Sequence, residues 1–255
     1  MKGYEKITDF HISPRVPIIG RIDGVAFHTL VKKLKLERPF DMNFATLMSK
    51  AAKDLASKVQ GCMVAYTQSD EISFLIRTDQ SNLTTPWFDN RIQKISSVAA
   101  SIISASFNRG LVTLFKDAPL AAFDCRIYSV PDLVEVNNYF IWRQNDCTKN
   151  SISAAAHFEL AKVFGRKTAR EMMHGLNRDQ QQELLWRKVS IDWNDYPPMF
   201  KRGIIISREK VEITTDKDQA IRNVWAASVA PIISSEEGRE KFFSIIDPIK
   251  DGEGG

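Results

Sequence analysis

The chain has 255 residues, of which 44% are hydrophobic and 26% charged, the composition of an ordinary globular protein. Its apolar runs are too short to span a bilayer, and its three cysteines form no CxxC pair, which argues against a disulfide framework and a zinc site. We therefore expect a cytoplasmic protein with one large domain or two small ones, and the net charge of +4 permits a polyanionic partner without requiring one.

The first predicted strand, residues 16–22, ends abruptly at Asp23-Gly24. A carboxylate at the end of a strand, followed by a glycine, lets a ligand approach the backbone closely. A basic amphipathic helix is predicted next, over residues 27–36, and it ends before Pro39. Its basic face is either solvated surface or, given its position after a strand-end aspartate, a phosphate contact.

A helix over residues 43–60 precedes two short apolar runs, 64–67 and 72–76, which meet at Asp70-Glu71. We interpret these runs as a β-hairpin, because they are rich in β-branched and aromatic residues. Two carboxylates about 4 Å apart repel each other by roughly 4 kcal/mol at an effective dielectric near 20. The turn is therefore predicted to hold a cation, and the alternative is an ordinary solvated acidic turn.

A helix over residues 89–109 and a strand over 121–130 complete the order strand, helix, strand, strand, helix, strand. This is the ferredoxin-like βαββαβ plan of an α+β protein, in which the first and third strands are central neighbours. Asp23, Asp70 and Glu71 are then expected to converge at one edge of the sheet. Such carboxylates, with basic residues nearby, form the metal platform of a polymerase palm and suit Mg²⁺.

Beyond Pro131 the sequence becomes mostly helical, and a small strand pair follows. The predicted helices cover residues 133–164, 168–174 and 179–188, and the predicted strands 204–207 and 211–214. Aromatic residues interleaved with Arg and Lys either bind nucleic acid or form a core stripe with a solvated basic face. We expect a palm catalytic core over 1–130, a helical RNA-binding extension over 131–215, and a C-terminal segment over 216–255 with a disordered end.

Five separated motifs resemble the tRNA-His guanylyltransferase family in order and spacing, from about Tyr4 to Gly203. They are Arg21-Ile22-Asp23-Gly24 with Phe27-His28, Gln68-Ser69-Asp70-Glu71 with Ser73-Phe74, Phe123-Asp124 with Arg126, Trp142-Arg143-Gln144 with Asp146-Cys147, and Pro198-Met199-Phe200-Lys201-Arg202-Gly203. The resemblance implies a 3′-5′ polymerase. Such an enzyme activates the 5′-monophosphate of a tRNA with ATP or GTP, and the 3′-hydroxyl of an incoming nucleotide then attacks the activated end.

The resemblance also implies site residues and an assembly, a homotetramer that shares tRNA contacts between subunits. Asp23, Asp70 and Glu71 would be the catalytic carboxylates, and Asp23, the Gly24 carbonyl and Asp70 would hold two Mg²⁺ ions. The implied nucleotide-binding residues are His28, Arg38 and Ser69, for the activating nucleotide and the 5′ end, and Arg91, Lys94 and Arg126, for the triphosphate. In the extension we expect RNA-binding residues at Arg143, Lys149, Asn150, Lys201 and Arg202.

Two departures from the family pattern concern the choice of RNA. Members that add guanosine to tRNA-His carry His-Ile-Asn-Asn after the Asp-Cys and a Lys before the Asn-Glu of a later helix. This chain has Thr148-Lys149-Asn150-Ser151 and Gln181 at those places. It therefore resembles the Thg1-like protein branch, which implies template-dependent repair of 5′-truncated tRNAs. The alternatives are guanylate addition to tRNA-His through another recognition surface, a palm-fold nucleotide cyclase, and a non-catalytic RNA-binding module.

Overall fold

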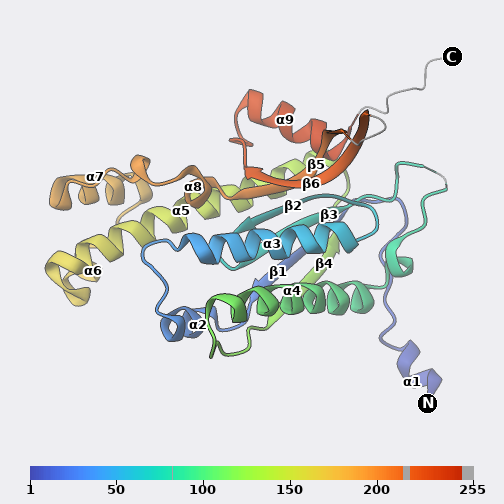
Figure 1. Ribbon diagram of the computed structural model, residues 1–255, viewed down its shortest axis with the longest axis horizontal. Coiled ribbons are helices and arrows are strands. Elements are labelled where there is room, and N and C mark those ends of the chain that lie inside the picture. Colours follow the sequence, from blue (N-terminus) through green and yellow to red (C-terminus); the bar gives the residue numbers. More distant parts are fainter. Residues whose placement is uncertain (82, 215–218, 249–255) are drawn as a thin grey trace.

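The computed structural model describes residues 1–81, 83–214 and 219–248, and in this part of the chain one six-stranded antiparallel sheet has the order β4-β1-β3-β2-β5-β6 (Figure 1). The strands are β1 (Ile18–Gly24), β2 (Cys62–Gln68), β3 (Glu71–Ile76), β4 (Phe123–Ser129), β5 (Ile204–Thr214) and β6 (Gln219–Val229). The protein is therefore of the α+β class.

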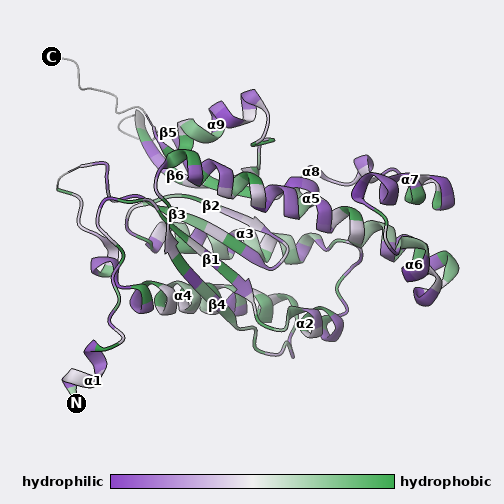
Figure 2. Cartoon of the chain, turned by 180° about the vertical axis from the view of Figure 1, so that it is seen from behind, coloured by the Kyte–Doolittle hydropathy of each residue, from purple (hydrophilic) through white to green (hydrophobic). Residues whose placement is uncertain are grey.

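Helices cover both faces of the sheet: α3 and α4 lie on one face, and α5 and α9 on the other (Figure 1). Helices α6 and α7 project beyond the sheet, and Figure 2 shows that hydrophilic residues dominate α7. The helices are α1 (Lys2–Lys6), α2 (Phe27–Leu34), α3 (Met42–Lys58), α4 (Ile92–Leu114), α5 (Leu133–Phe164), α6 (Arg166–Met173), α7 (Arg178–Val189), α8 (Pro198–Arg202) and α9 (Glu236–Ile246), with 3₁₀ turns at Trp87–Asn90 and Trp193–Asp195. None of the helices in the described ranges is long and apolar enough to cross a membrane.

The apolar runs of the central strands follow from burial on both faces of the sheet. Along β1, Ile18 and Ile22 join the hydrophobic cluster under α3 and α4, whereas Ile19 joins the cluster under α5 and α9. Alternate residues of a strand point to opposite faces, so a strand that is covered on both sides needs apolar residues throughout. All six residues of β3 are accordingly buried.

The predicted order of the first four strands is confirmed, because β1 lies between β3 and β4 and β3 pairs with β2. The predicted helix over 89–109 begins only at Ile92 and continues to Leu114. It begins later because Trp87–Asn90 forms a 3₁₀ turn in which Phe88 and Asp89 have positive φ angles of 50° and 54°.

The predicted strand pair 204–207 and 211–214 is wrong. These residues form one continuous strand, β5, which pairs with β6 and joins the sheet by pairing with β2. The polar run Arg208-Glu209-Lys210 resembles a turn in sequence, but its backbone pairs with β6 and the Arg208 guanidinium lies 5.2 Å from the Trp225 ring centroid. Strand β6 and helix α9 were not predicted, and the expected disordered end lies outside the described residues.

Candidate active site

The end of β1 and the turn between β2 and β3 bring Asp23 and Asp70 together. The Gly24 N–H donates a hydrogen bond to the Asp70 carbonyl oxygen (3.1 Å), and Asp23 stands opposite Glu71 in the strand register. In the turn, Ser69 has a φ of 48° and donates its hydroxyl to Asp70 Oδ1 (3.0 Å). The adjacency of Asp23 and Asp70 that the sequence predicted is therefore confirmed.

The electrostatics of this pair favour a bound cation. Burial raises the pKa of Asp70, the hydrogen bond from Ser69 opposes that rise, and the neighbouring charge of Asp23 raises the pKa further. A divalent cation would relieve both the desolvation and the repulsion. The two carboxylates and the Gly24 carbonyl are all oxygen donors, which fit Mg²⁺.

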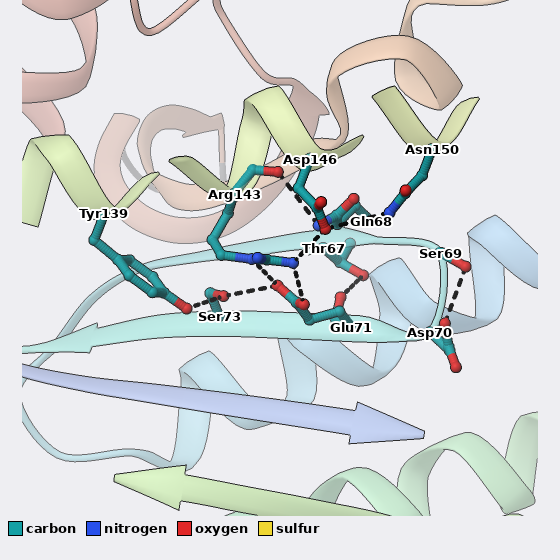
Figure 3. Close-up of polar contacts among 10 residues, drawn as sticks. All are labelled: Thr67, Gln68, Ser69, Asp70, Glu71, Ser73, Tyr139, Arg143, Asp146 and Asn150. Carbon is teal, nitrogen blue, oxygen red and sulfur yellow. Dashed lines mark hydrogen bonds and ion pairs between the residues drawn. The ribbon is translucent and has the colours of Figure 1, made fainter. Parts of the chain in front are cut away.

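Glu71 stands opposite Asp23 in the strand register, but its carboxylate is engaged by Arg143, so its role as a third catalytic carboxylate stays a prediction. Its carboxylate accepts hydrogen bonds from Arg143 Nε (2.7 Å) and Nη2 (2.5 Å), whereas Asp70 points away from Arg143 (Figure 3). Burial raises the pKa of Glu71, and its bonds to Arg143 act against that rise. Among the described residues, no three His, Cys, Asp or Glu side chains are grouped so that they could hold a metal ion.

Arg143 was predicted to bind RNA, but the structure places its side chain in a buried network of hydrogen bonds. Only 5% of the residue is exposed, and its guanidinium also bonds Asp146 Oδ2 (2.9 Å). Its carbonyl accepts the Gln68 side-chain amide (3.3 Å), so Arg143 ties α5 to both strands of the hairpin that carries Asp70. A guanidinium engaged in this way is not free to contact a phosphate.

A cavity of about 480 Å³ opens beside Asp70, between α2, α3 and α5. His28, Arg38 and Ser69, the residues predicted for the activating nucleotide, line it together with Asp70. Much of the remaining wall is apolar: Val31, Leu36, Pro39, Phe40, Phe44, Met48, Met199 and Phe200. A pocket with an apolar wall and a few convergent polar groups is the usual form of a site for a small molecule with a planar apolar part.

Two aromatic rings of this cavity were missed by the sequence reasoning. Phe40 and Phe200 stack in parallel, with centroids 4.8 Å apart and an interplanar angle of 8°, and both line the cavity. Phe200 stands in the last of the five motifs, which was the available signal, and Phe40 follows the Pro39 that ends the basic segment. Only the fold brings together residues so far apart in the chain.

The basic residues predicted for the triphosphate do not gather at the cavity. Arg126 lies on β4 opposite Arg21, with its Nε 3.9 Å from Asp124 Oδ1. Arg91 and Lys94 lie at the start of α4, which is the end far from α2 and from Asp70 (Figure 1). An α-helix rises about 1.5 Å per residue, so the 23 residues of α4 separate its ends by roughly 35 Å. Within one chain, Arg91 and Lys94 do not reach Asp70.

The other predicted RNA-binding residues lie on α5 and α8. Lys149 is exposed, and the exposed Asn150 donates to Asp146 Oδ2 (3.2 Å) and lines the cavity. Lys201 Nζ donates to the Asn194 carbonyl (2.5 Å), and the carbonyl of Arg202 accepts from the Tyr66 hydroxyl (3.1 Å). Their contact with RNA stays a prediction.

Comparison with known proteins gives consistent matches along most of the chain. A family model described as tRNAHis guanylyltransferase matches residues 1–131, and one described as Thg1 C terminal domain matches residues 134–241. The tRNA(His) guanylyltransferase of Debaryomyces hansenii is 31% identical over 204 residues, which cover 77% of this chain and 75% of the relative. A probable tRNA(His) guanylyltransferase of Bos taurus is 29% identical over 224 residues, covering 84% and 74%.

Solved structures of similar proteins agree with these matches. A bacterial tRNA(His) guanylyltransferase (Thg1)-like protein in complex with ATP aligns with a TM-score of 0.81 and 38% identity, over 95% of this chain and 96% of its own. A bacterial Thg1-like protein in complex with GTP aligns with a TM-score of 0.75 and 36% identity, over 97% of both chains. The Saccharomyces cerevisiae tRNA(His) guanylyltransferase aligns with a TM-score of 0.71 and 26% identity, over 87% and 96%.

Proposed function

Because the chain belongs to the tRNA-His guanylyltransferase (Thg1) family of nucleotidyltransferases, we propose that it is a template-dependent 3′-5′ polymerase that repairs the 5′ ends of truncated tRNAs. The observation that carries the proposal is the cavity beside Asp70, which is lined by His28, Arg38 and Ser69. It stands next to the two adjacent carboxylates at the end of β1 and in the hairpin turn.

In this proposal, β1 to β4 with α2, α3 and α4 form a ferredoxin-like polymerase palm. The support is the strand order β4-β1-β3-β2 and the register that places Asp23 beside the hairpin. Asp23, the Gly24 carbonyl and Asp70 would hold two Mg²⁺ ions. When bound, these ions supply activation of the attacking hydroxyl and charge neutralisation of the phosphates.

The cavity takes the activating nucleotide, ATP or GTP. The similar bacterial proteins have been solved with each of these nucleotides, and the cavity offers an apolar wall for a base and the cation of Arg38 for phosphates. The 5′-phosphate of the tRNA attacks the α-phosphate of the nucleotide, and pyrophosphate leaves. The 3′-hydroxyl of the added nucleotide then attacks the activated 5′-phosphate, and the nucleoside monophosphate leaves.

The choice of truncated tRNAs over tRNA-His rests on the two departures from the family pattern. The Thr148 hydroxyl donates to the Lys201 carbonyl (2.9 Å), and the Gln181 side-chain amide donates to the Leu176 carbonyl (3.0 Å). Both side chains are thus engaged within the chain, at the places where the tRNA-His enzymes carry their recognition residues. Specificity would then come from pairing with the opposite acceptor strand.

The test supplies labelled nucleotides to several 5′-monophosphorylated tRNAs that lack their first nucleotide, and to tRNA-His. We expect Mg²⁺-dependent extension of the truncated tRNAs. Asp70→Asn should reduce it by about a hundredfold or more, as loss of a group that stabilises the transition-state charge does. Asp117→Asn is the matched control, because Asp117 is exposed in the loop between α4 and β4. Equal activity of Asp70→Asn and wild type would remove the metal assignment.

The same assay separates the alternatives. Extension of tRNA-His alone would favour guanylate addition through another recognition surface, and GTP alone giving a cyclic product would favour a nucleotide cyclase. RNA binding without any product would favour a non-catalytic module.

We also propose a cytoplasmic homotetramer in which subunits share the tRNA. Its support is that Arg91 and Lys94, which the family resemblance assigns to the triphosphate, stand far from Asp70 within one chain. They would act at a site only across a contact with a neighbouring copy. Light scattering that finds a monomer at the working concentration would contradict the tetramer.

A further inference from the structure

Three aromatic rings and an arginine form a shelf on the α5 face of the sheet, beside the edge strand β4. We propose that this aromatic shelf, made of Arg21, Tyr128, Tyr139 and Trp142, stacks a nucleobase of the reacting RNA end or of the nucleotide added to it. The inference rests on the proposed function and adds a binding site to it.

Trp142 is the most exposed ring of the shelf, and it packs against Tyr139. Its relative exposure is 52%, although it belongs to a helix that is packed on the sheet. Its ring contacts Tyr139, with centroids 5.9 Å apart, and Tyr139 in turn contacts the exposed ring of Tyr128 at 6.1 Å. Tyr139 is 8% exposed and its hydroxyl is hydrogen-bonded to Ser73 (2.7 Å). The position of Tyr139 is therefore fixed, and it supports the two rings that pack against it.

Two guanidinium groups lie over the indole ring of Trp142. The Arg143 guanidinium lies 4.4 Å from the ring centroid and is fixed by Glu71, and that of Arg21 lies 5.8 Å away. The Nε of Arg21 is buried and has no hydrogen-bond partner among the described residues. Cations that hold an aromatic ring in this way limit its motion, so less entropy is lost when a planar ligand stacks on it.

The shelf is next to the candidate metal ligands. Arg21 and Asp23 are alternate residues of β1, so both side chains lie on the α5 face, in adjacent rows of the sheet. Trp142 directly precedes Arg143, which bonds Glu71 opposite Asp23. A base on Trp142 would therefore lie on the same face of the sheet as Asp23.

The proposed reaction needs a second binding site, in addition to the cavity that takes the activating nucleotide. Trp142 does not line the cavity beside Asp70, so a nucleotide in the cavity leaves the shelf free. The RNA end or the nucleotide being added must reach Asp23 by another route. Stacking on an aromatic ring accepts every base, because each base has a π face. A templated enzyme needs this tolerance, since the base that it adds is set by pairing and not by a pocket.

The test compares Trp142→Ala, Trp142→Phe and the matched control Tyr4→Ala, since Tyr4 is also an exposed aromatic residue, at 74%, but lies on α1, outside the segment expected to bind RNA. The first arm measures the Kd of a 5′-truncated tRNA in EDTA, where no chemistry occurs. The second arm measures the KM of the added nucleotide during extension. Melting temperatures establish that each variant is folded.

We expect Trp142→Ala to raise one of the two constants about fivefold or more, with most of the loss restored in Trp142→Phe. A raised Kd assigns the stacked base to the RNA, and a raised KM with an unchanged Kd assigns it to the added nucleotide. If Trp142→Ala keeps both constants within twofold of wild type, or if Tyr4→Ala changes them equally, the shelf is not a base-binding site. Extension by the wild type tests the proposed function separately, and the EDTA arm reports on the shelf even if no tRNA is extended.

Discussion

Glu71 and Arg143 form a buried ion pair directly under the hairpin turn that carries Asp70. The exposed fractions of their side chains are 11% and 6%, and Asp146 adds a second acidic partner to Arg143. Removing one member of such a pair leaves an uncompensated charge away from water. The pair therefore supports the hairpin turn that carries Asp70.

Glu71→Gln should lower the free energy of unfolding by about 1–3 kcal/mol, because it weakens the hydrogen bonds to Arg143 while Asp146 still pairs with that guanidinium. The double variant Glu71→Gln with Arg143→Met should lose less than the sum of the two single variants, because neither charge is then left alone. Urea unfolding measures both. Glu183→Gln is the control, since its pair with Arg187 is exposed. A cost no larger than that of the control would show that the buried pair contributes little.

The lowered pKa of His157 makes the stability of the protein depend on pH. Burial, followed by the charges of Arg170, Arg166 and Arg38, lowers its pKa below the ordinary value. The unfolded chain, with an ordinary histidine pKa of about 6.5, then binds a proton that the folded chain does not. The contribution of His157 to the free energy of unfolding is therefore present above about pH 6.5, and it is lost as the pH falls below that value.

Proton NMR titration should find the pKa of His157 lowered in the wild type and moved upward in Arg170→Gln. His157→Gln identifies the resonance, and Arg187→Gln on α7 is the control that should leave the titration unchanged. An identical pKa in wild type and Arg170→Gln would contradict this account of the shift.

At the scale of elements, α5 connects the hairpin to the C-terminal strands. The buried Gln144 donates its amide to the carbonyls of Arg202 (3.1 Å) and Pro231 (2.8 Å) and accepts the Ile233 N–H (2.9 Å). Its neighbour Arg143 bonds Glu71 at the start of β3. The motif from Trp142 to Cys147 therefore fastens three parts of the chain to one helix, which explains why its polar residues are buried.

Gly203 tests the junction between α8 and β5. A Cβ at this position would lie 2.5 Å from atoms of the Tyr66 ring, which is 1% exposed and cannot move aside. Gly165 is the matched control: its φ of 81° is close to the 80° of Gly203, but a Cβ there would meet nothing within 4 Å. Both alanine substitutions carry backbone strain of about 1–3 kcal/mol.

Gly203→Ala should therefore destabilise the protein by about 1–3 kcal/mol more than Gly165→Ala, which is the usual cost of overpacking a core. Chemical denaturation of the two variants gives this difference directly. Equal losses would mean that the Tyr66 ring adapts and that the junction is loosely packed.

For the whole molecule, the sequence was sufficient to predict the fold and the site wherever the local residue pattern agrees with the strand topology. The apolar runs at 16–22, 64–67 and 72–76 predicted the central strands, and the strand order then placed Asp23 beside Asp70. The partner of Arg143 is 72 residues away in the chain, and no local pattern reveals it. In β5, backbone pairing with β6 overrides a polar run that interrupts the apolar alternation. The direction of α4 likewise separates Arg91 from the site in a way that spacing does not show.

Templated addition at the Asp23 and Asp70 site is the central claim, and one measurement tests it most directly. A 5′-monophosphorylated tRNA that lacks its first nucleotide is offered all four labelled nucleotides with Mg²⁺, while the opposing template base is changed in turn to A, C, G and U. We expect the added nucleotide to follow the template base each time. Addition of guanosine whatever the template base, and only to tRNA-His, would contradict it.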